Sequence, residues 1–258
     1  MNKDQIKAIW KQTWPHCVAV LTFVVLTIVY FAPEFFDNKK LPQGDVQSSI
    51  GMGQDAREYH ERTGEYVDWS NAMFGGMPYN MCFTQTSKSV FSKLSPAIRI
   101  GLPNNTSALL FLYLIGFYIF MLCVGSSPWM GMLGAIAFAL ASYNIIIIDA
   151  GHVSKCLVIA TMPAVLGGVI LTYRKRYVMG IIVTLLSLGL NVYWYHQQIS
   201  YYLLIMILAL VIAYFIVAIK EKTLKDFFIA SFILLGVAVL AIIPAADKLA
   251  PTLDYTKE

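Results

Sequence analysis

A series of long apolar stretches, separated by short polar connections, limits what this chain can fold into. Crossing a bilayer takes about 20 residues of helix. About seven stretches come near this length, at residues 17–32, 107–124, 130–148, 156–173, 178–192, 201–219 and 227–246. Backbone polar groups inside a bilayer must be satisfied within the chain, which favours helices. We therefore predict an all-α fold, a polytopic membrane helical bundle of about seven transmembrane helices, in a single transmembrane domain of residues 1–258.

The composition supports this class and argues against several others. Hydrophobic residues make up 58% of the 258 residues and charged residues only 13%, whereas a soluble domain carries roughly 25% charged residues. No cluster of Lys and Arg is interleaved with aromatic residues, so a nucleic-acid partner is not expected. The sequence has no P-loop, dinucleotide-binding, HExxH or GxSxG motif, which argues against those chemistries. The four cysteines lack C-x-x-C spacing and are expected to be small buried hydrophobes.

Basic residues in short connections predict the orientation, because cytoplasmic loops carry the excess of Lys and Arg. If each stretch crosses once, one side receives Lys3, Lys7, Lys11, Arg174, Lys175, Arg176, Lys220, Lys222 and Lys225. The N-terminus is then cytoplasmic. The loop of residues 33–106, inserted between the first and second spans, lies outside the cytoplasm together with the turns 149–155 and 193–200 and the C-terminus. No small-residue cleavage site follows the first stretch, so we expect it to remain as an anchor.

The loop of residues 33–106 is the only long polar segment, and we expect chemistry to be located there. Asp45 as N-cap and Gly64 as C-terminal stop predict one helix of about five turns. A second, short helix around residues 90–98 has the pattern of an interfacial helix. Between them, residues 74–78 (FGGMP) predict an irregular turn.

Asp45, with Gln47 two residues later, lies just beyond the first predicted span. A carboxylate there suits a general base or a metal ligand. It equally suits an N-cap that accepts hydrogen bonds from backbone N–H groups. Asp45 and Asp149 can share a divalent cation, Mg²⁺ or Mn²⁺, only if the fold brings them within about 5 Å. The sequence therefore does not decide whether the protein uses a divalent cation as cofactor.

The turn of residues 149–155 (DAGHVSK) has almost no linker between two spans. His152 and Lys155 beside Gly151 suit an anionic group such as phosphate, because lysine supplies a compact charge and glycine permits close approach of the backbone. The alternative is that Lys155 only orients the next helix by reaching into the interface. The joint occurrence of Asp149, His152 and Lys155 favours the phosphate site.

The turn around residues 193–202 (YWYHQQISYY) contains an aromatic belt, which accounts for its Tyr and Trp residues without any site. His196, Gln197 and Gln198 are harder to explain in this way. Polar groups at the ends of membrane helices are costly unless they are paired or hydrated, so these three residues indicate a functional site.

At these places the chain resembles the YfhO-type bacterial membrane proteins, a branch of the GT-C glycosyltransferase superfamily. The matching residues are GDVQ at 44–47, GMG at 51–53, Trp69, FGGMP at 74–78, GHVSK at 151–155 and HQQISYY at 196–202. The resemblance covers essentially the whole chain, and several separated motifs in the same order are more specific than any one of them.

The resemblance implies a GT-C core in the bacterial cytoplasmic membrane. Such enzymes move a sugar from a polyprenyl-phosphate-linked donor to a cell-envelope glycan or lipid acceptor outside the cytoplasm. By this likeness Asp45 is the catalytic carboxylate, and the residues expected to bind substrate are Gln47, Gly75, Gly76, His152, Lys155, His196, Gln197 and Gln198. Proteins of this type usually continue into further spans and an extracytoplasmic domain, so the chain is expected to be a truncated core.

Two other classes remain open at this point. A transporter or flippase of a lipid-linked substrate predicts strongly polar residues near the middle of the membrane. The apolar stretches are almost free of them, with Asn144 and Asn191 toward the outer ends as exceptions. A noncatalytic membrane scaffold that presents its long loop to a partner is the third class.

Overall fold

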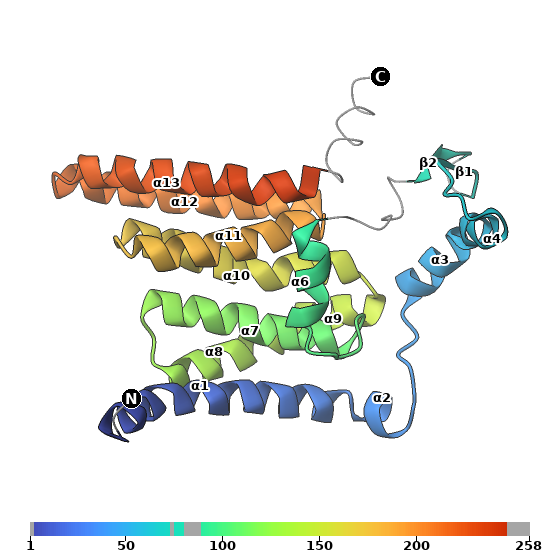
Figure 1. Cartoon of the computed structure of the whole chain (residues 1–258), viewed down its shortest axis with the longest axis horizontal. Helices are drawn as coiled ribbons and strands as arrows, with labels where there is room; N and C mark the ends of the chain where they lie inside the picture. Colours follow the sequence, from blue (N-terminus) through green and yellow to red (C-terminus); the bar gives the residue numbers. More distant parts are fainter. Residues whose placement is uncertain (1–2, 73–74, 80–88, 247–258) are drawn as a thin grey trace.

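The computed structural model describes residues 3–72, 75–79 and 89–246. Long helices lie side by side in a bundle, and a smaller group of elements extends from one end of it (Figure 1). The bundle contains α1 (Lys3–Tyr30), α7 (Ser107–Val124), α8 (Pro128–Ala139), α9 (Ser142–Ala150), α10 (Val153–Tyr173), α11 (Tyr177–Tyr193), α12 (Gln197–Lys220) and α13 (Leu224–Ile242). The other elements are α2 (Ala32–Phe36), α3 (Gly44–Met52), α4 (Gln54–Thr63), β1 (Trp69–Ser70), β2 (Met77–Pro78), α6 (Val90–Ile98) and the 3₁₀ turn η1 (Ile243–Ala245).

The prediction of an all-α polytopic bundle is confirmed by the length and composition of these helices. In the described residues, five helices are long and apolar enough to cross a membrane, namely α1, α7, α10, α12 and α13. The pair α8 and α9 meets the same test when taken together, which gives up to six spans. Helix α11 is apolar but has only 17 residues. Each of the seven predicted stretches thus corresponds to apolar helix.

The stretch 130–148 differs from the single helix expected there. It is divided into α8 and α9, which are bent by 51° relative to each other. The side chain of Asn144 donates a hydrogen bond to the backbone oxygen of Phe138 at 2.7 Å. This bond satisfies a carbonyl near the break, where the regular helical pattern ends. The bend was not predicted, because both helices are apolar and read as one continuous stretch.

Small residues allow the central helices to approach closely. A Cβ atom at Gly116 of α7 would collide with the backbone oxygen of Ala160 on α10. Gly168 lies against Thr184, and Gly180 lies against Thr172, so α10 and α11 are also in close contact. Such small residues are typical of membrane helix interfaces, where backbones pack directly. Helices α7, α10 and α11 form a rigid base for the turns at their ends.

The two ends of the bundle carry different residues. At one end, the turn between α10 and α11 meets the first turn of α13 through an ion pair of Lys175 with Asp226 at 2.6 Å. Arg174 donates to the backbone oxygen of Val124 at that end of α7 at 2.8 Å. The turns 149–155 and 193–200 lie at the opposite end of the same helices, next to α6 (Figure 1).

The long loop has more elements than predicted. One helix was expected from Asp45 to Gly64, but Gly53 divides it into α3 and α4. Gly64 ends α4 in the left-handed conformation with φ 75°, as predicted. Asp45 is not the N-cap of α3, and this prediction was wrong. Gln43 occupies the N-cap position without a side-chain cap, and Asp45 lies in the first turn.

The remaining loop predictions have mixed outcomes. Helix α6 is present as predicted and begins at Ser89, whose hydroxyl accepts a hydrogen bond from the backbone of Phe91. Residues Met77 and Pro78 of the expected irregular turn form β2, which pairs antiparallel with β1. Phe74 of that turn and Cys82 lie outside the described residues. Cys123 and Cys156 are buried free thiols as expected, whereas Cys17 is exposed on α1.

Candidate functional site

A cavity of about 600 Å³ lies at the end of the bundle where α6, α10 and α12 begin or end. We call it the polar cavity. Its charged and histidine side chains are Asp45, Arg99, His152, Lys155 and His196. They come from α3 (Asp45), from the residue after α6 (Arg99), from the N-cap and first turn of α10 (His152 and Lys155) and from the turn before α12 (His196). Three segments that are far apart in sequence, and were predicted to lie on the same side of the membrane, therefore meet in one place.

Asp45 and His152 are in direct contact within the polar cavity. The Oδ2 atom of Asp45 lies 2.5 Å from Nδ1 of His152. Their side chains are 55% and 40% exposed, respectively, so solvent screens the pair and it adds little to folding stability. Its main effect is geometric, because the contact fixes where the carboxylate of Asp45 points.

Gln43 holds the start of α3 against the turn before α10. Its side chain is buried, and its amide nitrogen donates to the backbone oxygens of Asn105 at 2.7 Å and Ile148 at 2.5 Å. Gly151 packs beneath it with a φ of +88°. A Cβ atom at Gly151 would lie 2.9 Å from Cβ of Gln43 and 3.1 Å from Cγ2 of Val46. The position of Asp45 thus depends on a glycine at residue 151.

Replacing Gly151 by alanine is expected to destabilise the protein and to displace α3. The left-handed conformation costs a residue with a Cβ atom roughly 1–2 kcal/mol, and the contact with Gln43 adds to this cost. We expect a lower midpoint of thermal unfolding for the protein in lipid nanodiscs. Gly44→Ala is the matched control, because a Cβ at Gly44 has nothing within 4 Å. Equal midpoints for the two variants would contradict the packing described here.

Arg99 contributes a charge to the polar cavity that was not predicted from the sequence. Its guanidinium donates to Asn104 at 2.9 Å and to the hydroxyl of Ser95 at 3.2 Å. Ser95 also accepts from the indole of Trp194 at 3.0 Å, which ties α6 to the turn before α12. Burial lowers the pKa of Arg99, although a guanidinium remains charged. The available signal was a single arginine at the end of the predicted interfacial helix.

His196 and Lys155 complete the basic side of the cavity. Burial of the imidazole lowers the pKa of His196 below its usual value, and the neighbouring Lys155 and His152 act in the same direction. Its Nδ1 atom is buried and has no hydrogen-bond partner among the described residues, and the same holds for Nε of Arg99. The cavity therefore has an excess of basic groups over its single carboxylate.

The other predicted binding residues lie elsewhere. Gln47 is exposed on α3 and is not part of the cavity lining. Gln197 and Gln198 are exposed and donate to the hydroxyls of Tyr195 and Tyr202, each at 2.8 Å. Gly75 and Gly76 come directly before β2, which lies away from the bundle (Figure 1). Gly76 packs against the indole of Trp69. The role of these five residues in substrate binding stays a prediction.

Asp149 does not share a site with Asp45. It lines a neighbouring cavity, while His152 and Lys155 of the same turn line the polar cavity. Among the described residues, no group of three or more His, Cys, Asp or Glu side chains is placed to hold a metal ion. The geometry thus gives no support to a cation shared by Asp45 and Asp149.

The polar cavity combines features suited to one kind of chemistry. Its described lining offers one carboxylate and four basic side chains at the ends of apolar helices, where a lipid headgroup would lie. Comparison of the chain with protein-family models, with curated proteins and with solved structures finds no match in any of the three, so the chemistry must be inferred from the site itself.

Proposed function

We propose that the protein is a membrane glycosyltransferase of the GT-C type. It transfers a sugar from a polyprenyl-phosphate-linked donor to a cell-envelope glycan or lipid acceptor outside the cytoplasm. The observation that carries this proposal is the meeting of Asp45 with four basic side chains in one cavity at the end of an apolar bundle. The basic side chains are those of Arg99, His152, Lys155 and His196.

The basic groups suit the phosphate of a lipid carrier. Arginine binds phosphate oxygens through its planar fork, and lysine supplies a compact charge. The Nε–H group of Arg99 is an unpaired donor, and the unpaired Nδ1 atom of His196 becomes a donor when it carries the proton, so an anion can use both with small side-chain movements. Helices α10 and α12 begin at this cavity and are apolar beyond it. A phosphate bound there can keep its polyprenyl chain in the membrane.

Asp45 suits the role of general base in the transfer step. The acceptor hydroxyl oxygen attacks the anomeric carbon of the donor sugar, and the bond from that carbon to the phosphate oxygen breaks. The hydroxyl proton passes to the carboxylate of Asp45, and the carrier leaves as polyprenyl phosphate. A phosphate needs no strong general acid to leave, so the cations only have to hold its charge. His152 keeps Asp45 in position through their contact.

The orientation that we propose places the polar cavity outside the cytoplasm of a bacterial cell. The basic turns then face the cytoplasm, as the distribution of Lys and Arg favours. In the seven-span GT-C arrangement, α11 and the bent pair of α8 and α9 each cross once. Helix α11 has 17 residues, or about 25 Å of helix at 1.5 Å per residue, which is somewhat short for a bilayer core of about 30 Å. Local thinning of the bilayer can accommodate this difference.

The experiment that tests the function is a transfer assay in reconstituted membranes. The purified chain is placed in liposomes with a synthetic polyprenyl-phosphate sugar and a mixture of cell-envelope glycans and lipids. A glycosyltransferase releases polyprenyl phosphate and forms a glycosylated acceptor. Movement of intact donor between leaflets without cleavage would indicate a flippase, and neither product nor movement would favour a scaffold.

Carrier binding is expected to strengthen as the pH falls below about 6.5, the usual pKa of histidine. Burial of His196 lowers its pKa, so the free protein holds this imidazole neutral at pH 7. Protonation adds a positive charge next to the phosphate, and the bound anion in turn favours the protonated form. The measurement is the Kd of a polyprenyl-phosphate sugar between pH 5 and pH 8. This diester keeps one negative charge over that range.

The contribution of His196 to folding stability changes with pH in the opposite sense to carrier binding. A histidine whose pKa is lowered by folding binds fewer protons in the folded state, so its contribution to stability declines as the pH falls through the unfolded value. His196→Gln should remove part of both effects. An identical pH profile of Kd in this variant and in the wild-type protein would exclude His196 from carrier binding.

A further inference from the structure

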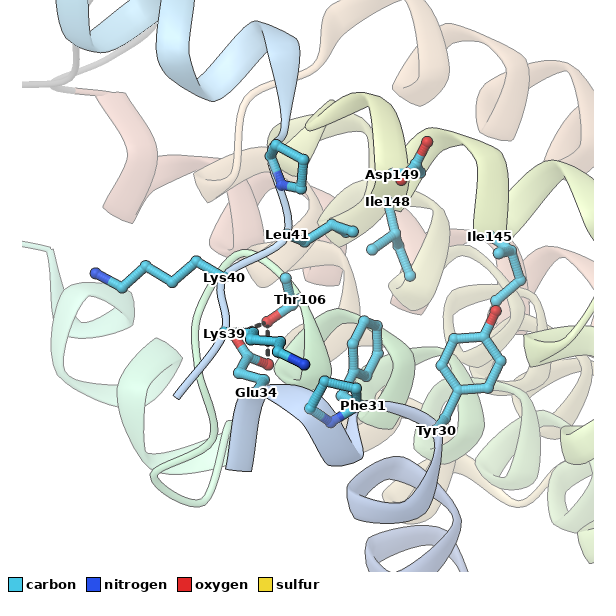
Figure 2. Close-up of a pocket in the computed structure, with 12 residues that line it drawn as sticks. Tyr30, Phe31, Glu34, Lys39, Lys40, Leu41, Thr106, Ile145, Ile148 and Asp149 are labelled. Carbon is cyan, nitrogen blue, oxygen red and sulfur yellow. Dashed lines mark hydrogen bonds between the residues drawn. The ribbon is translucent and has the colours of Figure 1, made fainter. Parts of the chain in front are cut away.

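A second cavity, of about 280 Å³, lies beside the polar cavity at the same end of the bundle. We call it the second cavity. Figure 2 shows its lining, which combines the rings of Tyr30 and Phe31 with the carboxylates of Glu34 and Asp149. Leu41 and neighbouring aliphatic side chains supply most of the remaining wall. No step of the transfer reaction described above uses these residues.

The segment around Gln43 separates the two cavities. Three stretches of chain each contribute one residue to the lining of the second cavity and a nearby residue to the lining of the polar cavity. The second cavity is lined by Pro42, Thr106 and Asp149. The polar cavity is lined by their near neighbours in sequence, Asp45, Asn105 and Gly151. Gln43 bonds to Asn105 and to Ile148 across this boundary. In each of these stretches, the residue that lines the second cavity is within one to three residues of the one that lines the polar cavity.

The polar groups of the second cavity suit hydroxyl donors. Both oxygens of Glu34 lie 2.7 Å from the hydroxyl of Thr106, which has only one proton to give. A carboxylate has about four acceptor positions, so Glu34 retains several. It is half-buried and makes no ion pair with the residues that the structure describes. Asp149 is exposed at the rim and likewise has no ion-pair partner in this part of the chain.

An anion is a poorer match for this cavity. Lys39 is already paired with Asp37 at 3.2 Å, and Lys40 extends away from the other labelled side chains in Figure 2. Two carboxylates without cation partners would repel a phosphate. Aromatic walls with a few hydrogen-bonding groups are typical of sites for small neutral molecules. Sugar rings offer both the apolar faces and the hydroxyl donors that such a lining can bind.

We propose that the second cavity binds a sugar ring of the acceptor glycan. The hydroxyls of this ring donate to Glu34 and Asp149, and its face rests against Tyr30 and Phe31. The acceptor then extends past Gln43 so that its terminal hydroxyl reaches Asp45. The identity of the ligand as acceptor rests on the proposed function, whereas the binding of a neutral sugar ring does not. An acceptor of at least two rings is required to bridge the two cavities.

Site-directed photocrosslinking tests this proposal separately from the transfer activity. A photoreactive amino acid is placed at Leu41, which lines the second cavity, or at Ile50, which lines the polar cavity. The protein in nanodiscs is exposed to biotinylated disaccharides and trisaccharides of glucose, galactose and N-acetylglucosamine, or to fluorescent polyprenyl phosphate. We expect at least one glycan to label position 41 preferentially, and the lipid phosphate to label position 50.

Removing the two carboxylates should weaken glycan labelling alone. The double variant Glu34→Gln with Asp149→Asn is expected to lower glycan labelling at position 41 by about tenfold, as the loss of a charged hydrogen bond predicts. Lipid labelling at position 50 should remain, which also shows that the variant is folded. Glu58→Gln, on the exposed helix α4, is the control and should leave both unchanged.

Each other outcome overturns one of the two proposals. The sugar site would be overturned by any of three results: no glycan labels position 41, the double variant leaves glycan labelling there intact, or the lipid phosphate labels position 41 preferentially. Absence of lipid labelling at position 50, with glycan labelling at position 41 intact, would instead argue against the proposed donor site.

Discussion

Replacement of Asp45 by asparagine is expected to lower sugar transfer by about 100- to 10,000-fold, the usual contribution of a general base. An amide has nearly the same shape as a carboxylate and can still bond to His152, but it cannot accept the proton of the acceptor hydroxyl. Donor binding should persist, because the cations of the cavity remain. The measurement is the initial rate of product formation in liposomes, together with the Kd of the donor.

Asp55→Asn is the matched control for this variant. Asp55 is an exposed carboxylate in the first turn of α4 and does not line the polar cavity. Its replacement should leave the rate of transfer unchanged. If Asp45→Asn retains the wild-type rate, or if the two variants lose activity equally, Asp45 is not the base.

Removing two cations of the polar cavity is expected to weaken donor binding strongly. A hydrogen bond to a charged group contributes about 1.5–3 kcal/mol, which corresponds to roughly a tenfold to hundredfold change in Kd. The double variant Lys155→Ala with Arg99→Gln removes two such partners of the phosphate. We expect an increase in Kd of at least about 100-fold, since contributions to one shared ligand need not be additive.

Lys93→Ala controls for the loss of positive charge in this experiment. Lys93 is exposed on α6, the helix that precedes Arg99, and is not part of the cavity lining. Its replacement should change the Kd of the donor by less than about threefold, as expected of a screened surface charge. A similar loss of affinity in Lys93→Ala would show that binding depends on overall charge rather than on the cavity.

The sequence was most informative about the spans and the turns between them. Residues 107–124 were predicted as an apolar stretch and form α7 with the same bounds. The turns with His152, Lys155 and His196 were identified because charged and amide groups are unusual at the ends of such stretches. These inferences depend only on local composition, which the sequence displays directly.

Other features depend on contacts between distant residues and were not predicted. Gln43 is the N-cap of α3, and its side chain bonds to Asn105 and Ile148, which are 62 and 105 residues away in sequence. No local pattern marks this role, so Asp45 was assigned to the cap instead. Arg99 was not selected as a site residue for the same reason. Asp149 and His152 belong to one turn, yet they line different cavities.

The most direct test of the account is a measurement of distance between the carrier phosphate and the histidines. The chain has four histidines. The protein is labelled with ¹⁵N-histidine, reconstituted in phosphorus-free lipid with a polyprenyl-phosphate sugar, and examined by ¹⁵N–³¹P dephasing in solid-state NMR. A hydrogen-bonded nitrogen lies within about 4.5 Å of phosphorus. We predict dephasing of His152 and His196, identified through the variants His152→Gln and His196→Gln. Dephasing of no histidine, or only of His16 and His60, would contradict the account.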